Sequence, residues 1–391
     1  MDAVAAEQSY SRGGEFVPLA PTRIVDTRTG LGSGSAAPRS GRSVLTFDVA
    51  GRAGIPAEKV HAAVLNVTVI GAGASGYAVV YPCCYKAPTA STHNFGPSEV
   101  VANQVVTAVG PKGRARIYVS GTAHVIVDVA GYYTDIGSEV IGDRLRPTSP
   151  VRLLDTRIGL GAARKQVSKH EEIRLAVSGR GPVPRNATAV VMNVTATNVA
   201  ESTFVTAFPY GMTRPNASNL NLVAGDTRAN LVTVKLGEGG AIGLYNHVGT
   251  VDLLADVVGY YTKATDPKAD AGRVVAFHPA RVLDTRSRQQ PVFAGSTVSV
   301  DTGFLTSVVG FQPAGAFINI TASEVTAETF ATLYPRRLPK RPNASTLNAS
   351  PGQIVPNLSM VSLRGAGPVG FTIYNHQGQA HMIADLVAIV L

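Results

Sequence analysis

Apolar and polar residues alternate with a period of two in the clearest segments of this chain. Residues 190–197, 316–323 and 125–130 each place apolar side chains on one face and a mixed, partly polar set on the other. Many of these residues are β-branched, and the pattern predicts β-strands with one buried face. Further strands are predicted at 231–236 and 243–245, separated by a glycine-rich turn. No stretch of ten residues has a convincing helical period, so we expect an all-β protein.

The whole pattern occurs three times. A motif of the form Pro-x-Arg, two hydrophobic residues and Asp-Thr-Arg begins at Pro21, Pro150 and Pro279, with a step of 129 residues each time. Each copy continues with an Asn-Val-Thr-type segment, a Tyr-Pro or Phe-Pro pair, a Ser-x-x-Asn segment, a single asparagine, and an apolar run around one aspartate. Repetition in this order indicates three homologous domains.

The repeat fixes the domain organisation that we expect. A chain of 391 residues is too long for one core, and units of about 120 residues suit independent cores. Short strands joined by turns predict that each unit is a β-sandwich or jelly roll. Linkers of about a dozen residues span at most about 40 Å, so neighbouring domains must nearly touch. Both a pseudo-threefold cluster and a row of beads fit. The boundaries are an N-terminal arm 1–15, β-domains 16–134, 144–262 and 274–391, and linkers 135–143 and 263–273.

Composition narrows the class of protein. With 45% hydrophobic and 16% charged residues, the chain is typical of a folded globular protein. Cys83 and Cys84 are its only cysteines, and we expect free thiols because a disulfide between neighbours is strained. The N-terminal residues lack the apolar core of a signal peptide, and no apolar run reaches the length of a membrane span. We therefore expect neither a classical secretion signal nor a membrane span.

The net charge of +9 raises the question of an anionic partner. Part of this charge lies in the basic segment 336–341, and such a patch attracts nucleic acid, anionic lipid or an anionic glycopolymer. No recognised nucleic-acid module accompanies it, so we do not expect nucleic acid to be the partner. An anionic glycopolymer stays open as a ligand.

The recurring polar residues are predicted to serve the fold, because buried polar groups need partners wherever the fold recurs. We expect the aspartate of Asp-Thr-Arg to accept backbone amides in a turn, and its arginine to pair with the aspartate of the last strand. Their oxygens would suit calcium, but no compact acidic loop gathers them, so neither a metal nor a cofactor is predicted. The set is Arg23, Asp26, Arg28, Asn66, Asn94, Asn103, Asp128, Arg152, Asp155, Arg157, Asn193, Asn221, Asn230, Asp256, Arg281, Asp284, Arg286, Asn319, Asn348, Asn357 and Asp385.

Enzyme chemistry is not predicted. The chain has no nucleophile elbow, zinc-binding helix or phosphate loop. His247 and His376 occupy matched positions, but Ser120 replaces them in the first copy, which favours a loop-packing role over catalysis.

The loop after the Tyr-Pro or Phe-Pro pair differs most between the copies. Its length changes by at most one residue while its charge and shape change completely. A fixed frame with variable loop tips is how binding surfaces are built, although drift on an exposed tip produces the same pattern. The candidate binding residues in these loops are Tyr85, Lys86, Tyr210, Arg214, Arg336, Arg337, Lys340 and Arg341.

These motifs resemble the repeated β-domains of actinobacterial exported proteins and of virion proteins of actinobacterial phages. The resemblance covers about 16–391; the first copy has Thr-His in place of Asn-Leu, and the third lacks the final Gly-Tyr-Tyr. It implies a non-enzymatic structural or adhesion protein of a virion: a tail, fibre or capsid-surface component that assembles in the host cytoplasm and contacts other virion proteins or the host envelope. The initiator Met1 and the lack of a signal sequence favour this expectation.

Two other functions stay open. One is a bacterial cell-surface module, located outside the cell, that binds cell-wall glycopolymer and neighbouring surface proteins. The other is a carbohydrate-active enzyme. Oligomers are compatible with each of these functions.

Overall fold

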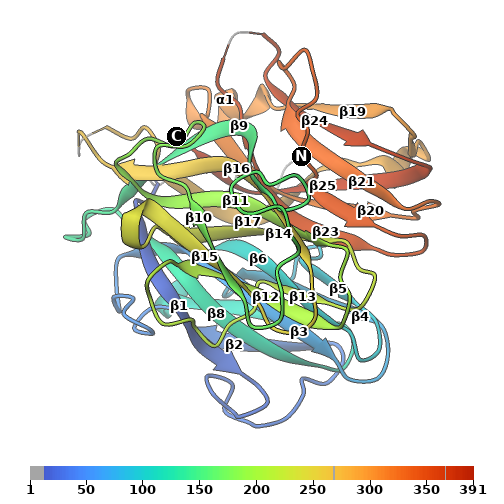
Figure 1. Cartoon of the computed structure of the whole chain (residues 1–391). Coiled ribbons are helices and arrows are strands. Elements are labelled where there is room, and N and C mark those ends of the chain that lie inside the picture. The colour runs from blue at the N-terminus through green and yellow to red at the C-terminus, as the bar shows by residue number, and fades with distance from the viewer. Residues whose placement is uncertain (1–12, 267–268, 366) are drawn as a thin grey trace.

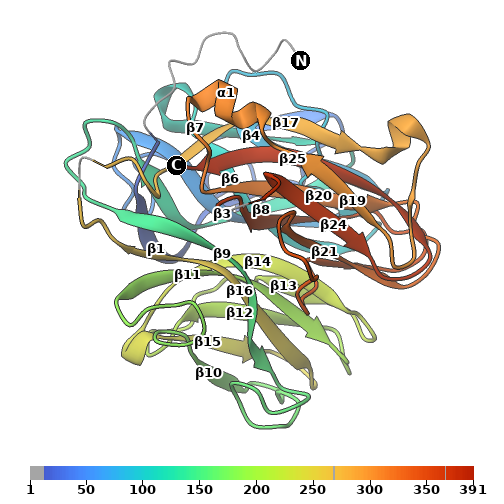
Figure 2. The ribbon, with the colours of Figure 1, turned by 90° about the horizontal axis from the view of Figure 1, so that it is seen from above.

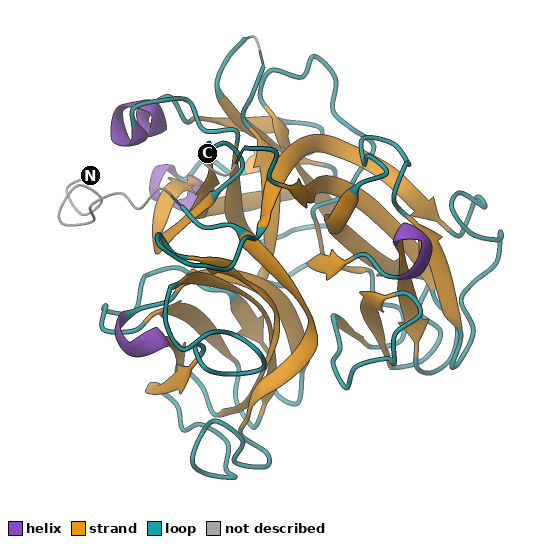
Figure 3. Ribbon diagram, turned by 90° about the vertical axis from the view of Figure 1, so that its left-hand side faces the viewer, coloured by secondary structure: helices purple, strands orange, loops and turns teal. Residues whose placement is uncertain are grey.

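A computed structural model describes residues 13–266, 269–365 and 367–391, and most of their regular structure is β-strand. Residues 1–12 of the predicted arm and 267–268 of the second predicted linker lie outside the described residues. The predicted all-β class is confirmed (Figure 1). The few helical turns lie at the periphery of the strands (Figure 3): α1 (Phe304–Val309) and the 3-10 turns η1 (Pro111–Gly113), η2 (Glu238–Gly240) and η3 (Thr285–Arg288).

The first domain is a sandwich of two four-stranded antiparallel sheets with jelly-roll connectivity. Its inner sheet has the order β1-β8-β3-β6 and its outer sheet the order β2-β7-β4-β5. Between them lies an apolar core that includes Val25, Leu65 and Ile117, all fully buried. The strands are β1 (Phe16–Asp26), β2 (Ser43–Asp48), β3 (Val60–Gly71), β4 (Gly76–Pro82), β5 (His93–Phe95), β6 (Val100–Ala108), β7 (Arg114–Val119) and β8 (Ala123–Thr134).

The second domain repeats this topology strand for strand. Its inner sheet is β9-β16-β11-β14 and its outer sheet is β10-β15-β12-β13. A single residue pair between β1 and β9, Phe16 with Asp143, joins the inner sheets of the first two domains edge to edge. The strands are β9 (Asp143–Asp155), β10 (Glu172–Ala176), β11 (Ala187–Thr197), β12 (Thr203–Pro209), β13 (Leu220–Leu222), β14 (Arg228–Lys235), β15 (Ala241–Asn246) and β16 (Asp252–Lys263).

The third domain keeps the same orders, β17-β25-β20-β23 and β19-β24-β21-β22. It adds a two-residue strand that pairs with β25, and it carries α1 between β19 and β20. The strands are β17 (Val274–Asp284), β18 (Val292–Phe293), β19 (Thr297–Asp301), β20 (Gly315–Ser323), β21 (Thr329–Pro335), β22 (Leu347–Ala349), β23 (Val355–Ser362), β24 (Gly370–Asn375) and β25 (Gln379–Val390).

The three sandwiches surround a common axis, as Figure 2 shows. Their inner sheets face one another, and the edge strands β6, β14 and β23 contact each other at the centre. A fourth apolar core fills this centre with residues from all three domains, among them Phe16, Val191 and Phe317. The pseudo-threefold cluster is therefore confirmed, and the row of beads is wrong.

The centre is not symmetric. Phe16 packs between Tyr133 and Tyr261, with ring centroids 5.2 and 4.3 Å away, and the two tyrosine hydroxyls are hydrogen-bonded at 2.6 Å. A Cβ on Gly131 would come within 2.4 Å of the Phe16 ring, which explains the glycine of Gly-Tyr-Tyr. The third copy has Val390 at the tyrosine position, so it packs against this aromatic group without joining it.

Candidate functional site

The Asp-Thr-Arg motif forms a turn after the first strand of each domain. In the first domain the Asp26 carboxylate accepts hydrogen bonds from the backbone N–H of Arg28 (3.0 Å) and from its guanidinium (2.8 Å). The closing aspartate, Asp128, pairs instead with Arg23 at 2.9 Å. Arg23 lies directly opposite Asp128 in the strand register, whereas Arg28 has already entered the turn. The arginine that reaches the last strand is thus the first of the motif and not the second, contrary to our expectation.

The same contacts recur in the other two domains. The first arginine of each motif bridges the turn aspartate and the closing aspartate, and the second bonds the turn aspartate. The bridging sets are Arg152 with Asp155 and Asp256, and Arg281 with Asp284 and Asp385; the second arginines are Arg157 and Arg286.

The two aspartates of each turn have opposite electrostatic character. Hydrogen bonds from the second arginine lower the pKa of Asp26, Asp155 and Asp284, the last to about 2. Burial raises the pKa of the closing aspartate, for example Asp128, more than its bonds to Arg23 lower it. In the first domain, two carboxylates thus share the Arg23 guanidinium, and Arg28 adds a second positive charge at Asp26, so the end of β1 is tied to β8.

The asparagine of the Asn-Val-Thr segment bonds to the next domain. Its side-chain amide donates to the backbone carbonyl of the serine that opens the neighbour's Ser-x-x-Asn segment. Because each domain donates to the next, the three bonds close a ring. They run from Asn66 to Ser218 (2.8 Å), from Asn193 to Ser345 (2.6 Å) and from Asn319 to Ser91 (2.8 Å).

The single asparagines close a second ring at the axis. They lie on the edge strands β6, β14 and β23, whose outward N–H groups would otherwise be buried without partners. Each side-chain oxygen accepts a backbone N–H of an adjacent domain's edge strand: Asn230 from Gln104 (3.0 Å), Asn357 from Leu231 (3.3 Å) and Asn103 from Leu358 (3.4 Å). The recurring asparagines at these positions thus hold the domains together.

A third group of asparagines does not take part in either ring. Asn94 donates to the Ser91 hydroxyl within its own turn (3.1 Å). For Asn221 and Asn348, we find no side-chain hydrogen bond within the part of the chain that the structure describes.

The variable loops between β4 and β5 and at the equivalent positions contact the protein itself at several of the candidate residues. The rings of Tyr85 and His278 of the third domain have centroids 5.6 Å apart. The Lys86 carbonyl is hydrogen-bonded to Nε2 of the same histidine at 2.9 Å. In the third domain, Arg336 pairs with Asp301 (3.0 Å). Arg337 donates a hydrogen bond to the Ser362 carbonyl (3.2 Å), and the guanidinium of Arg174 lies 5.4 Å from the ring centroid of Tyr210. Lys340 is exposed.

Two candidate arginines belong to partly exposed clusters that the sequence did not reveal. In the second domain, Arg214 lies 4.2 Å above the ring of Tyr245. Beside it, Phe204 and His247 stack with centroids 4.4 Å apart. His247 lies two residues after Tyr245, just beyond β15, and its backbone N–H donates to the Phe204 carbonyl of β12. The pairing of these two strands therefore places the His247 ring beside the Phe204 ring. We call these four residues the arginine–aromatic cluster of the second domain.

The third domain has the same cluster at the equivalent positions. Arg341 lies 4.3 Å above the ring of Tyr374, and Phe330 stacks on His376 at 4.4 Å. Ala87 and Ser120 replace the arginine and histidine in the first domain, where only Tyr77 and Tyr118 remain, 5.8 Å apart. The recurrence of the histidines was the one available signal, because the contacts themselves depend on strand register.

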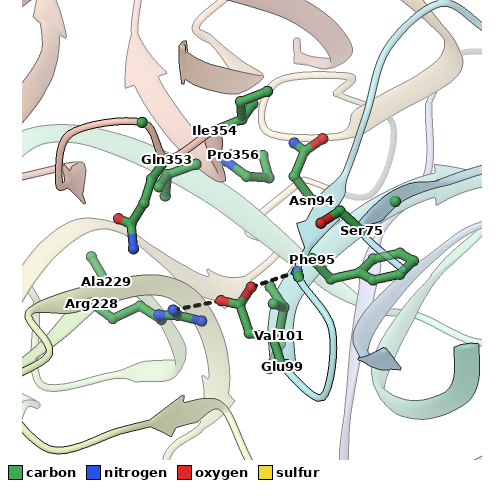
Figure 4. A pocket seen from close by; sticks show the side chains of 15 residues that line it. Ser75, Asn94, Phe95, Glu99, Val101, Arg228, Ala229, Gln353, Ile354 and Pro356 are labelled. Atoms are coloured by element: carbon green, nitrogen blue, oxygen red, sulfur yellow. Dashed lines mark hydrogen bonds and ion pairs between the residues drawn. The ribbon is translucent and has the colours of Figure 1, made fainter. Parts of the chain in front are cut away.

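A cavity of about 320 Å³ lies between the three domains, lined by residues of all of them (Figure 4). Glu99 pairs with Arg228 of the second domain at 2.9 Å and also accepts the N–H of Gly96 (2.8 Å). Gln353 and Ile354 contribute the wall from the third domain. The charged groups of this cavity therefore bond mainly to each other.

Within the described residues, no group of three or more His, Cys, Asp or Glu side chains is placed to hold a metal ion. None of the helices described there is long and apolar enough to cross a membrane. Cys83 and Cys84 are free thiols with sulfurs 3.1 Å apart.

No protein-family model and no curated protein matches this chain. Among solved structures, one from an atomic structure of Sulfolobus turreted icosahedral virus is 11% identical with a TM-score of 0.18, and the match covers 96% of this chain and 91% of that one. Another, from a description of the triple jelly roll fold and turret assembly in an archaeal virus, is 10% identical with a TM-score of 0.19, covering 96% and 90%. Both similarities are remote.

Proposed function

We propose that the protein is a non-enzymatic structural component of a virion, at the capsid surface or in a tail or fibre. The observation that carries this proposal is the closed ring of three jelly rolls in one chain. Asn66, Asn193 and Asn319 bond each domain to the next, so the chain forms a preassembled pseudo-trimer. Such a unit presents a rigid outer surface and suits a repeated position in a larger symmetric assembly.

The resemblance of the repeated motifs supports an actinobacterial phage as the source of the virion. In that setting the partners are other virion proteins, and the outer sheets are the surfaces that face the host envelope. Most of the polar residues that recur in the motifs make contacts within and between domains, which accounts for them without a reaction.

Immunogold electron microscopy with antibodies against the purified protein tests this proposal. We expect label on gradient-purified particles from an infected culture and none on uninfected cells. Label on the surface of uninfected cells would favour the second candidate below, and an absence of label on particles that contain all other virion proteins would contradict the proposal.

A second candidate function is a bacterial surface module that binds cell-wall glycopolymer. The two partly exposed arginine–aromatic clusters favour it, because aromatic rings and arginine are enriched at binding surfaces. A pull-down against cell walls, intact or stripped of glycopolymer, tests it. Binding that requires the glycopolymer supports this function, and equal recovery on both preparations contradicts it.

A further inference from the structure

The arginine–aromatic clusters lie on the outer sheets, which face away from the pseudo-threefold axis. Phe204 and Tyr245 point out of the sheet whose opposite face packs into the core of the second domain, and both are half-buried. Large aromatic side chains on an outward sheet face are not required by the core. The third domain repeats the arrangement with centroid distances that agree within 0.1 Å.

The arginine of the second domain keeps its hydrogen-bonding capacity. Arg214 is exposed and is placed by its contact with Tyr245, and no hydrogen bond from its guanidinium is found in residues 13–266, 269–365 and 367–391. In the third domain, one nitrogen of Arg341 donates to the Pro342 carbonyl at 3.3 Å. A guanidinium has five N–H donors, so both arginines can still bind an anion through a two-point contact.

The surroundings of the second-domain cluster are positive. The pKa of His247 is lowered first by burial and then by its neighbours His170, Arg214 and Lys169. His170 also lies 5.4 Å from the His247 ring. This excess of positive charge favours an anionic ligand, while the stacked rings offer a flat apolar surface.

We propose that the two arginine–aromatic clusters are binding sites for sugar rings that carry a carboxylate or a phosphate. The stacked pair, Phe204 on His247 or Phe330 on His376, packs against the apolar face of the sugar. The guanidinium of Arg214 or Arg341 binds its anionic group with paired hydrogen bonds. Two sites on one rigid chain bind one polymer with higher avidity than either site alone. This binding does not depend on the virion role.

Isothermal titration calorimetry of the full chain tests the proposal. Polygalacturonate supplies the carboxylate, poly(glycerol phosphate) supplies the phosphate, and neutral dextran is the uncharged control. We expect at least one anionic polymer to bind at about 0.15 M salt, where long-range attraction is screened. The double variant Arg214→Ala/Arg341→Ala should weaken that binding roughly tenfold or more, because charge-assisted hydrogen bonds are lost at both sites.

Two further variants distinguish binding at the arginine–aromatic clusters from non-specific electrostatic attraction to the positively charged chain. Arg180→Ala/Arg364→Ala removes the same charge from exposed positions of the same two domains, and it should change the affinity less than about twofold. Arg214→Lys/Arg341→Lys keeps the charge but not the planar donors, and it should also weaken binding. The proposal is overturned if neither anionic polymer binds, if the Arg180/Arg364 variant loses as much affinity, or if single-stranded DNA competes equally well. Immunogold labelling would still decide the virion role.

Discussion

At the scale of single residues, the structure explains why asparagine recurs at the domain contacts. An amide side chain both donates and accepts, so one residue can satisfy two buried groups. Asn193 donates to the Ser345 carbonyl at 2.6 Å and accepts from the Asn357 amide at 3.0 Å. An ionised aspartate at this position could accept but not donate, so it could not make both contacts.

Asn193→Ala should therefore destabilise the whole chain. The substitution removes the donor to the partly buried Ser345 carbonyl and one of the two acceptors of the Asn357 amide, which also donates to the Thr346 carbonyl. A buried polar group that loses its partner costs about 1–3 kcal/mol in comparable cases. Urea unfolding followed by circular dichroism measures the effect. Asn221→Ala is the matched control, since no side-chain hydrogen bond of Asn221 is found in the described part of the chain. Equal losses of free energy in the two variants would contradict the role assigned to Asn193.

Residue patterns predicted part of this arrangement. The repeat and the alternation gave three all-β units and marked the recurring asparagines as structural candidates. They could not identify the partner of Asn66, a carbonyl 152 residues away in another domain. They also assigned the closing ion pair to Arg28, because the register that places Arg23 opposite Asp128 is set by pairing between distant strands. The arginine–aromatic clusters were missed for the same reason.

At the scale of elements, the Asp-Thr-Arg turns fix the ends of β1, β9 and β17 through ionised carboxylates. The pKa of Asp284 falls from its ordinary value of 3.8 to about 2, mainly because Arg286 donates to it. A carboxyl whose pKa is lower in the folded chain stabilises the fold above its ordinary pKa. That contribution is lost as the pH falls through the folded value.

Asp284→Asn should thus cost most above pH 4, and its cost should shrink between pH 4 and pH 2. Urea unfolding of the unaltered chain and of Asp284→Asn measures the difference in their free energy of unfolding. The measurements are made at about pH 5, 4, 3 and 2, one unit apart around the titration. Asp48→Asn serves as the control because Asp48 and Arg52 form an ion pair in which both side chains are about half exposed. A cost for Asp284→Asn that stays constant over this range would contradict the assignment.

At the scale of the whole molecule, the ring is closed at the axis by a buried group of charges. Glu15, Arg144 and Arg273 occupy equivalent positions of the repeat, at or just before the start of the first strand of each domain. Glu15 accepts from Arg144 at 2.8 Å and from Arg273 at 3.2 Å, and it also accepts the N–H of Gly142. One carboxylate just before the first domain thus binds Arg144 at the start of the second domain and Arg273 just before the third.

Glu15→Gln should destabilise the closed ring more than any surface charge does. Removing this carboxylate charge leaves two guanidiniums close together, and the Arg144 side chain is only 2% exposed. Breaking a buried ion pair from one side costs about 3–5 kcal/mol in comparable proteins.

Asp48→Asn, which breaks the half-exposed pair with Arg52, should cost about 0–1 kcal/mol. Urea unfolding compares the two variants, and small-angle scattering should give a radius of gyration near the compact value of about 21 Å for the unaltered chain. If Glu15→Gln costs no more than Asp48→Asn, the charged group at the axis does not close the ring, and the other contacts between the domains hold it together.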